Sequence, residues 1–278
     1  MRAKTNKMHL QMKGDINTQI KDIMSGDAVY VYEDSTVTHA RQIMRDHFLR
    51  GFPVVNHNSK VKGMVTDQDM LNITSTKSDV TVSGFIRECP LICPETDIIV
   101  AAKMMLDGDV ERCPVVKSET ERDLAGIVSN SDLLRNVCFP AKGKVTASTI
   151  MNAKVVTCDP EDSIAKVWAK MLNHNYTGIP VVSKKKQLLG MVTRRDIIKA
   201  GFARVGLSDS HKSKPKDMPP VERIMSTPAY TVDQQASLEE CKDIILHNDV
   251  GRITVVDGSN PVGIIDRNDL LRACIDNS

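Results

Sequence analysis

Four short phrases in the chain each place an aspartate three residues after a threonine, serine or aspartate that follows a glycine and two apolar residues. They read GMVTDQD from Gly63, GIVSNSD from Gly126, GMVTRRD from Gly190 and GIIDRND from Gly263. A carboxylate only accepts hydrogen bonds, so it suits the two neighbouring hydroxyl groups of a ribose. A helix N-terminus adds unpaired backbone N–H groups that stabilise a phosphate, and a nearby hydroxyl adds a donor.

The same phrase also fits a structural role that needs no ligand. A Ser or Thr followed three residues later by an acid, ahead of an apolar run, is the signature of a helix capping box. In that interpretation the glycine serves the turn into the strand, which needs a residue without Cβ. Capping alone tolerates Glu, yet all four copies carry Asp, which favours a fixed reach to a ligand. The pairs that satisfy the capping pattern are Thr66/Asp69, Ser129/Asp132 and Thr193/Asp196.

The phrase returns at intervals of 63, 64 and 73 residues, which indicates an internal repeat of four units. Each unit carries an apolar dipeptide upstream of the phrase and, between the two, a run that reads FPVV, CPVV, IPVV or ITVV. Thirteen residues after the second member of the dipeptide, every unit has an apolar residue that we expect on a helix face. These residues are Val37, Ile99, Ile164 and Leu238.

The pattern within each unit predicts a small mixed structure. Segments such as AVYV at 28–31 and KVVT at 154–157 predict a first strand. The following helix carries a stripe of apolar residues at Val37, Ala40, Ile43 and Met44, the spacing of a buried helix face. The PVV run, a polar turn and the GMV run then predict a hairpin, and a last helix begins at the threonine. The order is strand, helix, strand, strand, helix.

This unit resembles the cystathionine-beta-synthase (CBS) domain, which in its family occurs in tandem pairs called Bateman modules. The chain resembles in particular the four-CBS proteins of archaea and, in domain count, the gamma subunit of AMP-activated protein kinase. The resemblance implies an α/β (mixed α+β) fold of four repeats paired into two modules. The expected boundaries are a basic tail at 1–19, repeats at 20–78, 79–138, 146–205 and 221–278, and a linker at 206–220.

The resemblance also implies a ligand site in each repeat. In the family, the aspartate holds the ribose hydroxyls, the Thr or Ser faces phosphate, and adenine lies among apolar residues of the first strand and the PVV strand. The ribose candidates are Asp69, Asp132, Asp196 and Asp269. The phosphate candidates are Thr66, Ser129, Thr193, Arg112, Arg194, Arg195, Arg252 and Arg267. The adenine candidates are Val29, Leu91, Val156, Tyr230 and Pro180. Core packing is the favoured role for most of them, and Tyr230 is the exception because its ring can stack on a purine.

The four copies differ in the charges around the candidate phosphate position. The third unit has two arginines inside its phrase and the fourth has Arg267 and Arg252, whereas the first has acidic Asp67 at the place of Arg194. We therefore expect the second module to bind a phosphorylated adenosine ligand better than the first. Asp266 replaces the Thr or Ser in the fourth unit and would repel phosphate. That site is more compatible with S-adenosylmethionine or an unphosphorylated adenosine.

Composition narrows the functional class. The 278 residues carry a formal net charge of +2, which gives no global argument for a nucleic-acid or membrane partner. No apolar run approaches the length of a membrane helix and no secretory apolar core is present, so we expect a cytoplasmic protein. The seven cysteines and seven histidines are scattered, which argues against a metal site. Protease, hydrolase and P-loop motifs are absent, so we do not expect an enzyme.

Three interpretations of function remain at this level. The favoured one is a regulatory sensor that binds AMP, ADP, ATP or S-adenosylmethionine and signals to a separate, unidentified effector protein. A nucleic-acid-associated regulator would use the basic tail, where Arg2, Lys4, Lys7 and Lys13 give a weak signal. A protein-interaction scaffold would use repeats that bind no ligand. Trp168, beside the apolar stripe of the third unit, predicts either core packing or an interface, and a homodimer is left open.

Overall fold

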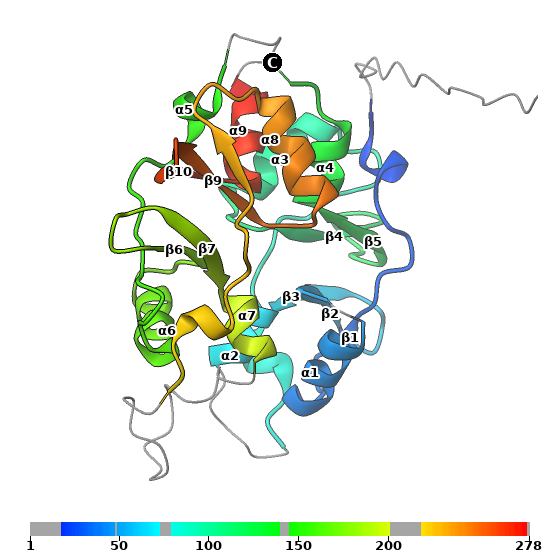
Figure 1. The fold of residues 1–278 in the computed structure, drawn as a ribbon. Coiled ribbons are helices and arrows are strands. Elements are labelled where there is room, and N and C mark those ends of the chain that lie inside the picture. Colours follow the sequence, from blue (N-terminus) through cyan, green and yellow to red (C-terminus); the bar gives the residue numbers. More distant parts are fainter. Residues whose placement is uncertain (1–17, 48, 73–78, 140–144, 201–217, 277–278) are drawn as a thin grey trace, which may run out of the picture.

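The computed structural model describes residues 18–47, 49–72, 79–139, 145–200 and 218–276 (Figure 1). The predicted basic tail, apart from its last two residues, and the predicted linker up to residue 217 lie outside these ranges. Within them, the order helix, strand, strand and helix repeats four times along the chain, which confirms the mixed α/β architecture predicted from the phrase.

The first and fourth units contain the complete predicted order of strand, helix, strand, strand and helix. In the first unit these elements are β1 (Val31–Tyr32), α1 (Val37–Asp46), β2 (Gly51–Val55), β3 (Val61–Thr66) and α2 (Asp67–Asn72). In the fourth they are β8 (Thr231–Asp233), α8 (Leu238–His247), β9 (Arg252–Asp257), β10 (Asn260–Asp266) and α9 (Arg267–Asp276). The first strand pairs in parallel with the PVV strand, and that strand pairs antiparallel with the next.

The second and third units keep the helices and the hairpin but shorten the first strand to a single bridge. The second contains α3 (Ile98–Asp107), β4 (Arg112–Val116), β5 (Leu124–Ser129) and α4 (Asn130–Asn136). The third contains α6 (Ile164–Asn173), β6 (Gly178–Val182), β7 (Leu188–Thr193) and α7 (Arg194–Lys199). The bridges join Ile92 to Val115 and Cys158 to Val181. The prediction of a strand at 154–157 was therefore wrong, because only Cys158, the residue after this segment, pairs with the hairpin.

The long first helix of every unit starts at a capped residue. The side chains of Thr36, Asp97, Ser163 and Ser237 accept a backbone N–H of the first turn. These caps correct one predicted position, because the helix of the second unit begins at Ile98 and buries Ile98, whereas the sequence placed Ile99 on the helix face equivalent to Val37. The segment before this helix is one residue shorter than in the other units, so Ile98 is the buried counterpart of Val37.

Adjacent units pair by exchanging their entry segments, which are η1 (Ile20–Asp22), η2 (Val82–Phe85), α5 (Ala147–Ile150) and η4 (Val221–Arg223). Ile20 N donates to Thr96 O of the second unit at 3.0 Å, and Val82 N of the second unit donates to Ser35 O of the first at 2.9 Å. The third and fourth units make the same reciprocal contacts through Ala147 and Val221. This reciprocity gives each pair a pseudo-twofold relation.

The sequence suggested that the glycine at the start of each phrase serves a turn. In the structure, the glycine is needed because the partner unit of the pair approaches it closely. A Cβ on Gly126 would lie 2.6 Å from Ser25 O, and one on Gly63 would lie 2.3 Å from Arg87 O. Both oxygens belong to the partner unit of the pair. A side chain at either glycine would push the partner's backbone away from the strand.

The two pairs pack together through the helices of the second and fourth units, where α4 and α3 contact α9 and α4 contacts α8 (Figure 1). Their buried residues form one continuous core that includes Leu133 and Leu134 from α4 and Leu270 and Leu271 from α9. The first and third units each have a separate core. Trp168 is 2% exposed within the core of the third unit, which agrees with packing. Within the described residues, no helix has the length and apolar character needed to cross a bilayer.

Candidate functional site

All four predicted aspartates accept the backbone N–H at the start of their helix through one carboxylate oxygen, and three of them also accept a hydroxyl there. In the third unit, Asp196 Oδ2 accepts from the backbone N–H of Thr193 at 2.8 Å and from its hydroxyl at 2.6 Å. These bonds satisfy a backbone donor that the helix itself leaves unpaired. The same two bonds, at 2.9 and 2.6 Å, form in the pairs Asp69/Thr66 and Asp132/Ser129, so the predicted capping pairs are confirmed.

The second carboxylate oxygen, Oδ1, has different surroundings in each of these units. In the first unit, Nε of Arg87 donates to Asp69 Oδ1. In the second, Arg135 Nη1 lies 3.3 Å from Asp132 Oδ1. In the third, none of the residues that the structure describes donates to Asp196 Oδ1, so this oxygen is available to a ligand hydroxyl.

The fourth unit brings two carboxyl groups together. Asp269 Oδ2 accepts from the backbone N–H of Asp266 at 2.8 Å, and Asp266 Oδ1 accepts from the backbone N–H of Asp269 at 3.1 Å. Burial, together with the charge of Asp266, raises the pKa of Asp269 to about 7. Near neutral pH this pair therefore holds a proton for much of the time, and the remaining negative charge disfavours a phosphate beside it.

Two of the predicted phosphate arginines are engaged inside their own units. Arg194 is 6% exposed, and its Nη2 donates to Met171 O at 2.9 Å and to Asn175 Oδ1 at 3.2 Å, at the end of α6. Arg267 is 7% exposed, and its Nη2 lies 3.1 Å from Asp249 Oδ1, just beyond α8. Both guanidinium groups thus tie the second helix of a unit to the end of its first. Arg195, next to Arg194, is exposed on α7.

Arginines from all four units interact electrostatically where the units meet. We define the central arginine cluster as Arg50, Arg112, Arg194, Arg252 and Arg267. Burial lowers the pKa of the last four of these groups, and the charge of Arg50 lowers the pKa of Arg112, Arg252 and Arg267 further. Nearby acids, including Glu111 and Asp67, offset part of this repulsion. Because Arg194 and Arg267 are engaged inside their own units, the positive charge of the cluster favours an anion mainly through its other members.

Arg252 links the two units of the second module. Its side chain crosses from the fourth unit to donate to Thr177 Oγ1 of the third. A Cβ on Gly178 would lie 3.1 Å from Arg252 Cδ, so the glycine leaves room for this arginine. Arg252 therefore stands between the phrase of its own unit and that of the third unit.

The predicted adenine residues divide into buried and exposed positions. Leu91 packs against Val55, Val61 and Val116 between the hairpins of the first module. The strand pairing also shows that Leu91 is not the counterpart of Val29, because the shorter second unit places Pro90 there. Pro180 is buried, and Val29 and Val156 are half-buried. Tyr230 is 45% exposed, so its side chain is accessible from solvent, and its ring is of the kind that stacks on a purine.

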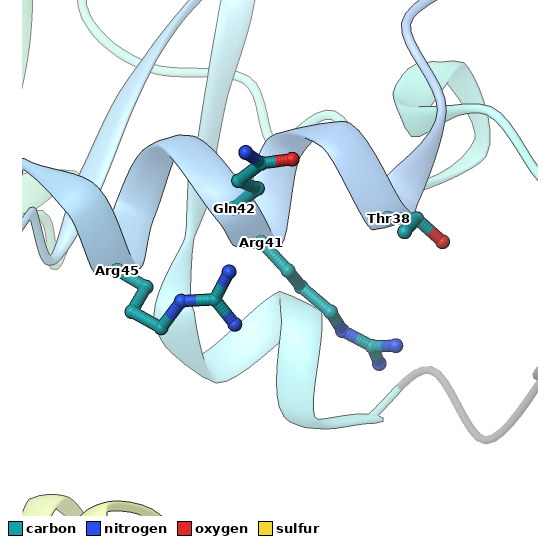
Figure 2. Close-up of a pocket in the computed structure, with 4 residues that line it drawn as sticks. All are labelled: Thr38, Arg41, Gln42 and Arg45. Carbon is teal, nitrogen blue, oxygen red and sulfur yellow. The ribbon is translucent and has the colours of Figure 1, made fainter.

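Two surface cavities lie on helices rather than at the predicted ribose carboxylates. The first, of about 160 Å³, is lined by Thr38, Arg41, Gln42 and Arg45, and Figure 2 shows Arg41 and Arg45 extending from the same side of α1. Arg41 donates to Met70 O at 2.6 Å, which ties α1 to α2. The second, of about 500 Å³, is lined by Arg135, Lys242, Asp243, Leu246 and His247, and approaches a candidate only through the Arg135 contact with Asp132.

Sequence reasoning missed Arg50 and Arg87. Arg50 precedes the PVV strand by one residue more than Arg252 does, and this offset hid it from the comparison of the four units. In the structure, its Nη2 lies 3.4 Å from Asp249 O of the fourth unit. Arg87 follows the apolar dipeptide of the second unit, but its side chain serves the first, which only the exchange of segments reveals.

Comparison with known proteins agrees with the repeat and its pairing. The family model for the CBS domain matches residues 20–75, 82–138, 147–203 and 221–276. The uncharacterized protein MJ1404 of Methanocaldococcus jannaschii is 28% identical over 271 residues; the match covers 94% of this chain and 63% of MJ1404. The chain therefore spans less than two thirds of the length of that relative. The uncharacterized protein MJ1225 of the same organism is 24% identical over 88% of this chain and 94% of its own length.

Solved structures show the same arrangement. The crystal structure of MJ1225, described as a candidate archaeal homologue of γ-AMPK, superposes with a TM-score of 0.74 at 22% identity and covers 92% of this chain and 99% of that one. An uncharacterized conserved protein from Pyrococcus horikoshii gives a TM-score of 0.65 at 20% identity, covering 92% and 100%. Four matched repeats, paired by reciprocal exchange and carrying the same capped aspartate phrase, establish that this chain belongs to the CBS domain family.

Proposed function

We propose that the chain is a regulatory protein that binds an adenosyl ligand, AMP, ADP, ATP or S-adenosylmethionine, between paired CBS units and passes its bound state to a separate effector protein. The observation that carries the proposal is the carboxylate of Asp196. One of its oxygens is fixed by Thr193, and the other has no partner among the described residues. A rigid acceptor with one unused oxygen is suited to ribose hydroxyls.

CBS-domain pairs have been crystallised with AMP and with 5′-methylthioadenosine and S-adenosyl-L-methionine. Those proteins match less than half of this chain, with TM-scores of 0.40 and 0.39. We therefore rest the proposal on this chain's own residues.

We further propose that the second module is the better site for a phosphorylated ligand. The support comes from Arg252, which reaches Thr177 of the third unit, and from Arg195, which is exposed on α7 next to the phrase. Arg194 and Arg267 support the site indirectly, because they fix the helices that carry Asp196 and Asp269. The acidic pair of the fourth unit favours a ligand without phosphate at that position.

Calorimetric titration of the nucleotide-stripped protein with AMP, ATP and S-adenosylmethionine tests the proposal. We expect at least one of them to bind, and Asp196→Ala to remove one site. The matched control is Asp97→Ala, because Asp97 caps α3 by accepting from Ile99 N at 2.8 Å but is not a ribose candidate. In both variants the free energy of unfolding should fall by about 1 kcal/mol, which lowers the melting temperature. Only Asp196→Ala should lose a binding site.

Absence of binding in the wild-type protein would reject the proposal. The phrase would then be a helix cap alone, and the search would move to the scaffold interpretation or to nucleic acid. The basic tail on which the nucleic-acid alternative depends lies outside the described residues, so the structure does not favour that alternative.

A further inference from the structure

The backbone of Arg87 is held against the first unit, although Arg87 belongs to the second. Arg87 N donates to Met64 O at 2.8 Å, and Met64 N donates to Arg87 O at 2.9 Å. The absence of a side chain on Gly63 permits this close approach. The side chain of Arg87 therefore starts from a fixed point beside the N-terminus of α2, where Asp69 lies.

The guanidinium of Arg87 occupies the oxygen that a ribose would need. Its Nε donates to Asp69 Oδ1, while Asp69 Oδ2 accepts both donors of Thr66. The Asp69 side chain is only 7% exposed, whereas that of Arg87 is 54% exposed. A hydrogen bond between a guanidinium and a carboxylate is stronger than one from a neutral hydroxyl, so exchanging Arg87 for a ribose is unfavourable.

The other three units place a short side chain at the same point. Ser226 exchanges two backbone bonds with Met191, at 2.8 and 3.0 Å, in the geometry that Arg87 has with Met64. Ser25 and Asn152 make the equivalent backbone contacts with Ile127 and Ile264. Among the described residues, none of these three side chains bonds to the aspartate of the phrase it faces.

We infer that Arg87 is the specificity-determining residue of the first unit, and that it closes the ribose position there by pairing with Asp69. This inference rests on the proposed function, since it concerns which of the four aspartates can receive a ligand. It also gives the first module a different role from the second. Of its two ribose positions, the one in the first unit is filled by a side chain from the partner unit, whereas Asp132 in the second meets only Arg135 of its own helix, at 3.3 Å.

Titration with AMP, ATP and S-adenosylmethionine tests the inference through the number of sites. Arg87→Ser places in the first pair the residue found at Ser25 and Ser226, and we expect it to add one site. Adding Asp69→Ala to this variant should remove the new site, while Asp69→Ala alone should leave the wild-type number unchanged. The reciprocal change, Ser226→Arg, should remove the same site that Asp196→Ala removes.

Each contrary outcome has a distinct meaning. Loss of a wild-type site in Asp69→Ala would show that the first unit binds ligand with Arg87 in place, and would overturn the inference. Ligand binding by the wild type with no gain in Arg87→Ser would overturn it too, while leaving the proposed function intact. No binding by any of these proteins would reject both. Arg87 is more than half exposed, so the serine variant should fold, and its melting curve will verify this.

Discussion

The backbone carbonyl oxygen of Ser226 lies 2.6 Å from the point where a Cβ on Gly190 would be. Ser226 belongs to the fourth unit and Gly190 to the third, and the neighbouring Met191 exchanges two backbone hydrogen bonds with Ser226. The glycine of the phrase is therefore a contact between units, and it controls how closely the partner segment approaches the aspartate.

Gly190→Ala should destabilise the second module. The added methyl group would overlap a backbone oxygen, and relieving such overpacking costs about 1–3 kcal/mol. Chemical denaturation followed by the fluorescence of Trp168, the only tryptophan, measures this in the same unit. Gly84→Ala is the control, because no atom lies within 4 Å of its added Cβ. Gly84 lies in the second unit, so circular dichroism follows the unfolding of both variants beside the Trp168 signal. An equal loss of stability in both variants would contradict the explanation.

The neighbours Arg194 and Arg195 should respond differently to substitution by methionine. Arg194→Met removes the bonds to Met171 O and Asn175 Oδ1 and should lower the free energy of unfolding by about 1–3 kcal/mol. Arg195→Met alters an exposed side chain and should change stability by no more than about 0.5 kcal/mol. If Arg195 contacts phosphate, its variant should weaken binding of ATP more than binding of S-adenosylmethionine. Equal melting temperatures for the two variants would refute the structural role of Arg194.

Features that depend on nearby residues could be predicted from the sequence. The contact of Asp196 with Thr193 spans three residues, so its spacing alone indicates the cap. The apolar stripe of α1 was likewise predicted, and Val37, Ala40 and Met44 are buried while Ile43 is half-buried. Both features depend on helix geometry, which the sequence period reports directly.

Features that depend on which units meet could not be predicted in this way. Arg50 becomes part of the central arginine cluster only because the first and fourth units approach each other. Arg87 faces Asp69 only because adjacent units exchange segments. The second unit has one residue fewer ahead of α3 than the other units. An ungapped comparison of the sequence did not reveal this difference, because it still places an apolar residue, Ile99, at the expected step. Sequence spacing within a unit carries no information on these contacts.

The acidic pair of the fourth unit should make stability depend on pH. The pKa of Asp269 is about 7 in the folded chain, because of burial and the charge of Asp266, and about 4 in an unfolded chain. Between these values the folded state binds more protons, so the free energy of unfolding falls as pH rises. This contribution is fully present below about pH 4 and is lost as pH rises through about 7.

Asp269→Asn tests this origin of the pH dependence. The amide of asparagine does not titrate. The drop in melting temperature between about pH 5 and about pH 8 should therefore be smaller in the variant than in the wild type. The control is Asp196→Asn, where the capping partner is Thr193 rather than a second acid, and it should keep the wild-type drop. A drop of unchanged size in Asp269→Asn would exclude Asp269 as its source.

The continuous core of the second and fourth units should make them unfold together, while the third unfolds independently. Ile245 of α8 and Ile197 of α7 are both 0% exposed, the first in the continuous core and the second in the separate core of the third unit. Replacing either by alanine removes the same atoms and should lower the local free energy of unfolding by about 2–5 kcal/mol.

Hydrogen exchange should then report which elements each substitution destabilises, because protection falls throughout a cooperative unit. Ile245→Ala should speed exchange in α3 and α4 of the second unit as well as in α8 and α9, whereas Ile197→Ala should speed it in α6 and α7 alone. Faster exchange confined to the fourth unit in Ile245→Ala would mean that the two units share a surface but do not unfold cooperatively.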